Sequence, residues 1–375
     1  MSTTLDQRLR KLLAEQAHAG LTRTPPAISH REGVRYQLQG RPVIGFCSND
    51  YLGIADHASL AVATTSTGAT ASRLVCGDLP EHRSVEGRLA QLAGAEDAVL
   101  FPSGFQLNVG VLPALIHQDD KVFSDALNHA SLIDGLRLAH AELHVLDHAA
   151  SPPPTTTGAL RWWVTEALFS MDGDYADPGA MRRHLATDGC LYLDEAHSFG
   201  LFSRDARATG HAGLHGITPT VLVGTLGKTF GCAGAFVAGT ATICKWIRGA
   251  ARSFVFSTGI SPVIAAQVHR AIDLVDGPEG QLRRARLWAN VEHLARRLGL
   301  ADHHAPIFRV LLGSNEAALA LSAQLVDRGW HVQAIRPPTV PRGTSRLRIT
   351  VTAAHEPAQI DAFADDLRAL LSSCA

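Results

Sequence analysis

Seven short apolar runs, separated by helical patterns, constrain the fold of this chain more than any other feature. The runs are AVLFPSG, KVFSDA, AELHVLD, RWWVTEALFS, CLYLDEA, TVLVGTLG and GAFVAG, in that order along the chain. Several are continuous rather than alternating, which is typical of strands covered by helices on both faces. Residues 84–94 and 177–189, which lie between them, have the apolar spacing of amphipathic helices. The pattern predicts an α/β fold with a mostly parallel central sheet flanked by helices.

The pattern differs at the two ends of the chain. Residues 5–17 predict a leading amphipathic helix, and residues 36–55 predict a short hairpin followed by a loop. A long helix is expected over 279–299, after which shorter strand and helix patterns follow. We therefore expect an N-terminal helix and hairpin segment at 1–45, a large α/β domain at 46–279 and a small α+β domain at 280–375.

Composition narrows the class of protein. The 375 residues are 46% hydrophobic, enough for a large core, and the net charge of −1 provides no global attraction for nucleic acid. The six cysteines are scattered without a CxxC pair, which favours reduced thiols in the cytoplasm. The first twenty residues carry charges throughout, and the longest uncharged runs are broken by glycine and polar residues. We therefore expect a cytoplasmic protein with no signal peptide, no membrane span and no nucleic-acid partner.

Lys228 is the only charged residue in the stretch VLVGTLGKTFGCAGAFVAG. An ammonium group is costly to desolvate, so a lysine among glycines and small apolar residues needs a reason. Glycines allow backbone or a ligand to approach closely. A desolvated lysine has a lowered pKa and can attack a carbonyl carbon. The alternative interpretation is a lysine that extends from a loop into solvent.

Asp194 ends the apolar run CLYLD, at the edge of the sheet where α/β folds bind ligands. Its carboxylate either caps the following segment or faces a ligand. Pyridoxal phosphate would use both residues, because it offers an aldehyde to a lysine and needs an acidic partner at its pyridine nitrogen. FPSGFQLN adds a strand, a glycine turn and a helix start at Gly104 and Phe105, which favours a phosphate.

Two other interpretations of these motifs are weaker. LGKT and DEAH are similar to the two Walker motifs, but a P-loop needs glycine where Leu222 stands, and the two motifs occur in reversed order. A nucleotide-binding α/β module is therefore the remote alternative. The 19 histidines lack the paired spacing of zinc ligands, and HExxH is absent, so we expect no metal.

A larger set of motifs resembles one enzyme family, the α-oxoamine synthases. The set is SNDYLG, PSGFQLN, LNHASLIDG, TEALFSMDGD, YLDEAHSFG, TLGKTFGCAG, STGISP and IRPPTVPRGTSRLRITVTAAHE. These fold-type I pyridoxal-phosphate enzymes join an amino acid to an acyl thioester and release CO₂. The resemblance covers nearly the whole chain, with the motifs in the same order.

Residues 334–356 are most similar to the branch of the family that condenses L-alanine with pimeloyl-CoA or a pimeloyl carrier protein. Branches of the glycine C-acetyltransferase, 5-aminolevulinate synthase and serine palmitoyltransferase types stay open as alternatives. Their motif residues do not fix the amino acid or the acyl chain. The resemblance also implies a homodimer with active sites at the subunit interface.

The resemblance implies a role for each matching residue around the cofactor. Lys228 would hold pyridoxal phosphate covalently, Asp194 would pair with the pyridine nitrogen, and His197 would hydrogen-bond the phenolic oxygen. His129 would stack on the ring and contact substrate. The other cofactor residues would be Gly104, Phe105, Ser170, Thr225 and Thr258, with Thr258 reaching the phosphate of the neighbouring subunit.

The resemblance assigns the substrate to residues near both ends of the chain. Arg348 would clamp the carboxylate of the amino acid, for which a guanidinium is well shaped, and Thr339 would contact substrate. Arg23 would be the N-terminal substrate arginine, although Thr22 is the other residue that fits this position. Taken singly, His129 also fits a helix cap, Thr339 a turn and Arg348 a cation at a sheet edge.

Two further segments depart from the pattern of the family. Residues 66–77 contain fewer glycines than the family's loop at this place. Ser198 and Phe199 stand after DEAH where the family has Gly-Thr. We expect the larger Phe199 to add bulk near the active site.

Overall fold

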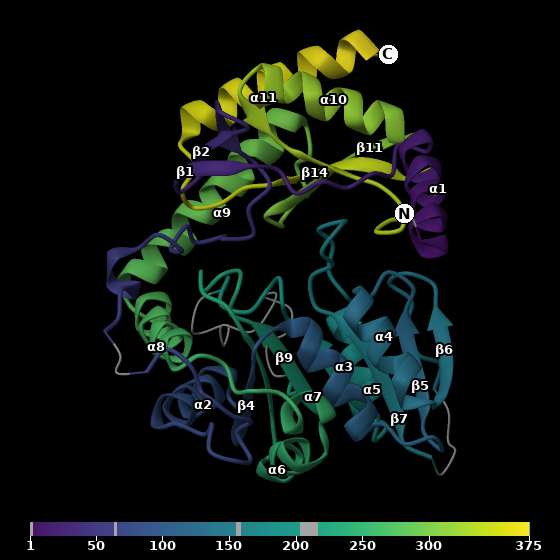
Figure 1. Ribbon diagram of the computed structural model, residues 1–375, viewed down its shortest axis with the longest axis vertical. Coiled ribbons are helices and arrows are strands. Elements are labelled where there is room, and N and C mark those ends of the chain that lie inside the picture. The colour runs from purple at the N-terminus through teal and green to yellow at the C-terminus, as the bar shows by residue number, and fades with distance from the viewer. Residues whose placement is uncertain (1–2, 64–65, 155–158, 203–216, 375) are drawn as a thin grey trace. The chain divides into compact units, whose positions relative to one another are not determined.

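The computed structural model describes residues 3–63, 66–154, 159–202 and 217–374 of the chain (Figure 1). They form two compact units. The large unit contains residues 49–170 and 174–286, and the small unit contains residues up to 48, residues 171–173 and residues from 287 onward. The expected division into domains at 1–45, 46–279 and 280–375 stays a prediction.

The large unit is built on a seven-stranded sheet to which each of the seven apolar runs contributes one strand. The order is β4 (Asp97–Phe101), β10 (Ala235–Gly239), β9 (Val221–Thr225), β8 (Cys190–Asp194), β7 (Arg161–Glu166), β5 (Lys121–Asp125) and β6 (Glu142–Leu146). β10 runs antiparallel to both of its neighbours, whereas β5 to β9 pair in parallel. The mostly parallel sheet expected from the sequence is confirmed.

Helices cover both faces of this sheet. One face packs against α3 (Gly104–Leu115), α4 (Ala130–Ala139), α6 (Ala241–Ala250) and α7 (Arg252–Val255). The other face packs against α5 (Pro178–Leu185). Trp162 belongs to the first core and Trp163 to the second, as alternation along a strand requires. Near β4, α2 (Pro80–Ala93) packs on α8 (Pro262–Asp276), and the 3₁₀ turn η1 (Ala58–Leu60) lies beside α8.

The small unit contains two further sheets. One is antiparallel, in the order β11 (Ile307–Gly313), β14 (Ser345–Thr350) and β13 (Gln333–Ile335). The other has the order β1 (Ile28–Glu32), β2 (Arg35–Leu38), β3 (Arg41–Gly45) and β12 (Trp330–His331). Parallel pairing of β3 with β12 joins residues near the two ends of the chain in one sheet. β1 was not expected, because all five of its residues are exposed and it has no apolar pattern.

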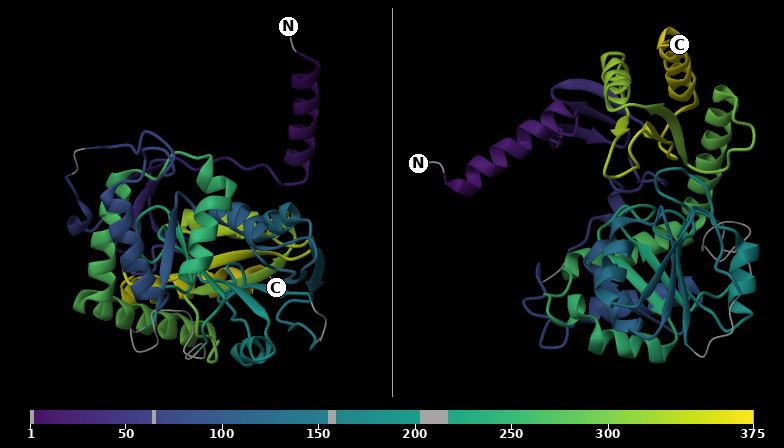
Figure 2. Two further views of the ribbon diagram at one scale, coloured as in Figure 1. Left: turned by 90° about the horizontal axis from the view of Figure 1, so that it is seen from below. Right: turned by 90° about the vertical axis from the view of Figure 1, so that its right-hand side faces the viewer.

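Four helices complete the small unit. They are α1 (Thr4–His18), the C-terminal part of α9 (Pro278–Leu298), α10 (Asn315–Asp327) and α11 (Pro357–Cys374). α1 confirms the expected leading helix, and Figure 2 shows it projecting from this unit with no buried residue. The core of the unit includes Phe46, whose ring stacks on Phe363 at 4.0 Å. Among the helices described, none is long and apolar enough to span a bilayer.

A three-residue segment, 171–173, packs within the small unit although the residues around it belong to the large unit. The side chain of Asp172 is only 6% exposed and accepts hydrogen bonds from Arg346 on β14, at 2.6 Å, and from Arg309 on β11. Gly173 has φ +73°, and a Cβ there would lie 2.1 Å from the carbonyl oxygen of Ile307. A carboxylate and a glycine are therefore both required for this segment to fit against the sheet.

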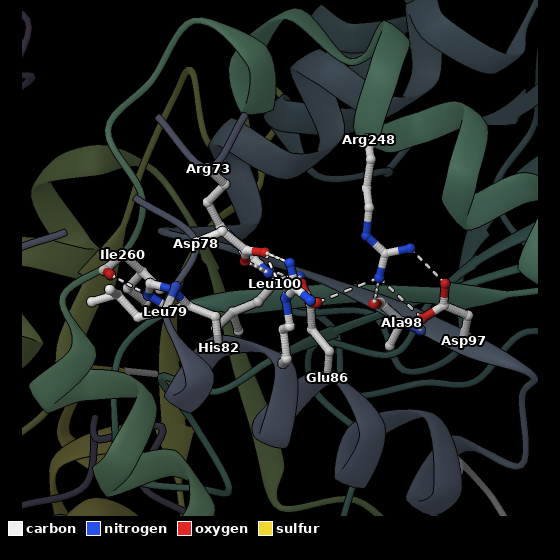
Figure 3. A network of polar contacts seen from close by, with 11 residues as sticks. Arg73, Asp78, Leu79, His82, Glu86, Asp97, Ala98, Leu100, Arg248 and Ile260 are labelled. Atoms are coloured by element: carbon white, nitrogen blue, oxygen red, sulfur yellow. Dashed lines mark hydrogen bonds and ion pairs between the residues drawn. The ribbon is translucent and has the colours of Figure 1, made fainter. Parts of the chain in front are cut away.

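A buried ion network connects α2, β4 and α6 in the large unit (Figure 3). Arg73 donates to Glu86 on α2 at 2.5 Å and to Asp78 at 2.5 Å, and its side chain is only 6% exposed. Glu86 also accepts from the backbone N–H of Leu100 at 2.8 Å and pairs with Arg248 at 3.4 Å. Glu86 therefore satisfies two guanidinium groups and one strand amide at once.

Replacing Glu86 with alanine should destabilise the large unit strongly, because Arg73 would keep a buried charge with one partner fewer. Breaking a buried ion pair from one side costs about 3–5 kcal/mol. The matched control is Arg83→Ala, which removes an ion pair to Asp78 from a side chain that is 74% exposed. That change should cost at most about 1 kcal/mol. Urea unfolding followed by circular dichroism measures both variants, and equal losses would contradict the network's role.

Candidate active site

A cavity of about 170 Å³ lies at the C-terminal edge of the central strands of the large unit. It is bounded by residues at the ends of β7, β8 and β9 and by the first turns of α3 and α4. Its described lining consists of Gly104, Phe105, Asn108, His129, Ser131, Glu166, Asp194, Ala196, His197, Val223, Gly224, Thr225 and Lys228. Seven of the twelve residues expected in the site therefore share one cavity: Gly104, Phe105, His129, Asp194, His197, Thr225 and Lys228.

Lys228 lies in the connection between β9 and β10, which pair as an antiparallel hairpin. Backbone bonds close this connection, with Leu226 donating to Gly234 and Cys232 donating to Leu226, each at 2.9 Å. Gly231 has φ +59°, and a Cβ there would lie 2.7 Å from the backbone nitrogen of Ala55. Gly231 thus serves close approach of the chain to itself. Lys228 itself is a cavity residue, as the sequence predicted.

Asp194 is the last residue of β8 and is buried, with only 5% of its surface exposed. One carboxylate oxygen accepts from the backbone N–H of Ala196 at 2.9 Å, and the other accepts from Asn108 Nδ2 at 3.0 Å. The two interpretations of this residue are therefore compatible, because Asp194 both caps the next segment and lines the cavity.

His129 caps α4, since its Nδ1 accepts from the backbone N–H of Ser131 at 3.2 Å. Its own backbone N–H donates to Glu166 Oε1 at 2.7 Å. Burial lowers the pKa of the imidazole; Lys228 lowers it further, while Asp194 acts in the opposite direction. A neutral imidazole at the N-terminus of a helix is suited to planar contact with an aromatic ligand.

His197 is buried and hydrogen-bonded to Tyr51, with 2.7 Å between its Nδ1 and the tyrosine hydroxyl. Because His197 lines the cavity, its second ring nitrogen, Nε2, can contact a ligand there. Phe199, expected to add bulk near the site, does not line the cavity. Its ring packs in the core beside Phe230 at 5.7 Å and Phe236 at 4.8 Å, and its effect on the site stays a prediction.

Glu166 was not expected in the site, yet it lies beside Asp194. The two residues pair across β7 and β8 and are 3% and 5% exposed. Burial raises the pKa of Glu166 to about 8, and the charge of Asp194 adds to the rise. Below that pH one carboxyl group of the pair is neutral, which spares the cavity the repulsion of two buried charges.

The opposite end of the cavity can receive an anion. Ser103 caps the twelve-residue α3, and within the described part of the protein the N–H groups of Gly104 and Phe105 have no partner. Such amides at a helix N-terminus bind phosphate well. Thr225 adds a hydroxyl, whose oxygen lies 3.3 Å from the carbonyl of Gly234. An amine, a buried carboxylate and a phosphate-binding turn around one cavity fit the donor set that pyridoxal phosphate requires.

Five expected residues do not line this cavity. Ser170 is buried at the end of the segment after β7, and Thr258 pairs with Ser72 in an isolated bridge. The three expected substrate residues, Arg23, Thr339 and Arg348, belong to the small unit. Two of these meet, because Arg23 donates to the hydroxyl of Thr339 at 3.0 Å. Their roles stay predictions.

Four side chains around the expected residues were missed: Tyr51, Asn108, Ser131 and Glu166. Glu166 gave the same signal as Asp194, since it is a carboxylate at the end of an apolar run. Asn108 follows Gly104 by one helical turn, a spacing that places both on one side of α3. Tyr51 and Ser131 gave no signal of their own. The partner of Tyr51, His197, lies in a distant segment, and Ser131 contacts His129 only because His129 caps α4.

Comparisons with known proteins agree with this donor set. The family described as aminotransferase class I and II matches residues 41–367. The chain is 42% identical to the 8-amino-7-oxononanoate synthase of Anaeromyxobacter dehalogenans, over 94% of this chain and 92% of the relative. It is 41% identical to the enzyme of the same name from Bordetella petrii, over 98% and 97%.

Solved structures share the fold. Serine palmitoyltransferase from S. paucimobilis, with bound PLP and myriocin, has a TM-score of 0.89 at 25% identity, covering 99% of each chain. The 8-amino-7-oxononanoate synthase of Francisella tularensis has a TM-score of 0.71 at 24% identity, covering 88% of this chain and 98% of the other. The fold-type I transferase fold expected from the sequence is confirmed.

Replacing Glu166 with glutamine should change how stability depends on pH. The pKa of Glu166 is raised in the folded protein to about 8, from an ordinary value near 4.5. Between these values the folded state holds a proton that the unfolded state has lost, so the free energy of unfolding falls as pH rises. Glutamine does not ionise and removes this contribution. The melting temperature of the variant relative to the parent should therefore rise from pH 5 to pH 8, and a constant difference would contradict the buried acid.

Proposed function

This chain belongs to the α-oxoamine synthases of the aminotransferase class I and II family, and we propose that it joins L-alanine to a pimeloyl thioester. The reaction depends on pyridoxal phosphate, releases CO₂ and the free thiol, and forms 8-amino-7-oxononanoate for biotin synthesis. The observation that carries the proposal is that Lys228, Asp194, His129 and His197 line one buried cavity in a chain of this family.

The residues of the cavity would hold the cofactor by complementary chemistry. Bound pyridoxal phosphate supplies an electron sink for the negative charge that develops at the α-carbon of the amino acid. Lys228 would hold the cofactor through its amine. Asp194 would keep the ring nitrogen protonated, and the free amides of Gly104 and Phe105 would bind the phosphate with Thr225. Ser170 completes the proposed set of cofactor residues.

The same side chains would move protons and stabilise charge during the reaction. The amine of Lys228 would take the proton from the α-carbon of the amino acid and later return one. His197, held by Tyr51, would donate to the phenolic oxygen of the cofactor. His129 would lie against the ring and help to stabilise the oxyanion that forms when the thioester is attacked.

The proposed substrate contacts are Arg348, Arg23 and Thr339. Arg348 lies on the fully buried strand β14, where a guanidinium is held rigidly enough to clamp the planar carboxylate of the amino acid. The bond between Arg23 and Thr339 supports a joint role for these two residues in substrate binding. The acyl group would arrive on CoA or on a carrier protein.

Assembly and location complete the proposal. We propose a homodimer in which Thr258 contacts the phosphate in the partner's site. A cytoplasmic location stays a prediction from the scattered cysteines.

The proposal is tested by cofactor attachment and by a substrate panel. Protein loaded with pyridoxal phosphate should be yellow, and borohydride reduction should fix the cofactor to the peptide that contains Lys228. The Lys228→Ala variant should lose more than about 10²-fold in turnover, the lower range for a proton-transferring group.

Amino-acid and acyl specificity separate the branches of the family. L-alanine with a pimeloyl thioester should give CO₂ and free thiol, whereas glycine or serine with other acyl thioesters should react much more slowly. Faster turnover of serine with palmitoyl-CoA would replace the proposal with the serine palmitoyltransferase type, which is favoured by likeness in fold. Nucleotide-dependent stabilisation without cofactor binding would overturn both.

A further inference from the structure

A chain of buried polar side chains connects His129 to Asp194. Asn108 on α3 lies between them and is 1% exposed, as is Ser131 on α4. Asn108 Nδ2 is 3.0 Å from Asp194 Oδ2 and 2.9 Å from Ser131 Oγ. Ser131 Oγ is in turn 2.8 Å from Nδ1 of His129. Three segments far apart in the sequence are thereby joined by consecutive hydrogen bonds.

Two fixed groups determine the orientation of the Asn108 amide. Tyr192 on β8 donates its hydroxyl to Asn108 Oδ1 at 2.7 Å, and burial raises the pKa of this tyrosine so far that it stays a donor. The ionised carboxylate of Asp194 can only accept. With the amide reversed, its oxygen would face Asp194 and its NH₂ group would face the tyrosine. Both NH₂ hydrogens therefore point to Asp194 and to Ser131.

The direction of the remaining bonds follows from this orientation. Ser131 Oγ accepts from Asn108, so its own proton is directed to Nδ1 of His129. The backbone N–H of Ser131 also points to Nδ1, at 3.2 Å. A ring nitrogen that accepts two hydrogen bonds carries no proton, and in a neutral imidazole the proton must then be on Nε2.

We infer that Asn108 is a positioning residue which, through Ser131, fixes His129 in the tautomer that carries its proton on Nε2. His129 is then a neutral donor with a blocked Nδ1 and does not act as a base through that atom. The same amide orients the carboxylate of Asp194. One side chain thus sets both the acid partner and the histidine of the cavity.

The use of this tautomer rests on the proposed function. An Nε2–H group on His129 can donate to an oxygen that gains negative charge, which fits stabilisation of a thioester oxyanion. Proton transfer at the α-carbon is then left to Lys228. The tautomer itself is a property of the protein without cofactor, so the two proposals are tested separately.

The test is ¹⁵N NMR of the full chain labelled with [¹⁵N]histidine, without cofactor and again after loading with pyridoxal phosphate. The His129→Gln variant identifies the signals of His129. The parent protein should show an unprotonated Nδ1 and a protonated Nε2 at neutral pH. Detection of the proton on Nδ1 would overturn the inference.

Matched variants separate positioning from mere folding. Asn108→Asp keeps the acceptor for Tyr192 and leaves at most one donor, the proton that the new carboxyl group shares with Asp194, so the hydroxyl of Ser131 turns to the new carboxyl oxygen and the single-tautomer signal of His129 is lost. Ser131→Ala should shift the signal partly, since the backbone donor remains, and Ser131→Thr should restore it. An unchanged tautomer in both Asn108→Asp and Ser131→Ala would contradict the role of the amide.

Cofactor affinity provides the second measurement. Asn108→Asp places a second carboxyl group against Asp194, so that the two share one proton and Asp194 is a weaker partner for the ring nitrogen; pyridoxal phosphate should therefore bind at least about tenfold more weakly, by absorbance titration. Ser131→Thr should bind like the parent. A parent protein that has the expected tautomer but binds no cofactor would leave the inference standing and overturn the proposed function alone.

Discussion

The negative charge of Asp194, held inside the large unit at the end of β8, is the constraint on which the cavity depends. A buried carboxylate is costly unless it is hydrogen-bonded, and this one receives Ala196 N–H and the Asn108 amide. Burial raises the pKa of Glu166 and lowers that of His129; the charge of Asp194 adds to the first effect and opposes the second. The protonation states of the neighbouring acid and histidine are therefore set by burial together with one ionised group.

The architecture explains why these groups meet. Parallel strands end at one edge of the sheet, so Glu166 and Asp194 become neighbours although 27 residues lie between them in the sequence. The same edge receives the first turns of α3 and α4, which add free backbone amides and His129. The antiparallel β10 then returns the chain from Lys228 to the sheet, which fixes both ends of the loop that carries the amine.

Much of the fold and of the cavity could be predicted from the sequence, and the residues that were missed were missed for physical reasons. The seven strands, the sheet edge and the positions of Lys228 and Asp194 follow from local patterns of apolar residues and glycine. Tyr51 could not be found this way, because its importance lies in a partner 146 residues away. The place of Phe199 beside His197 in the sequence likewise does not show that its side chain packs in the core.

The glycines of the hairpin around Lys228 have a consequence for the evolution of the enzyme. A Cβ at Gly224 would lie 2.3 Å from the ring of Phe236, and one at Gly234 would lie 2.9 Å from Ile260. Gly224 and Gly234 consequently leave almost no room for a side chain, whereas a Cβ at Gly227 would meet only ordinary contacts, the nearest at 3.7 Å. A mutational library aimed at altered chemistry would therefore yield most when it leaves Gly224 and Gly234 untouched.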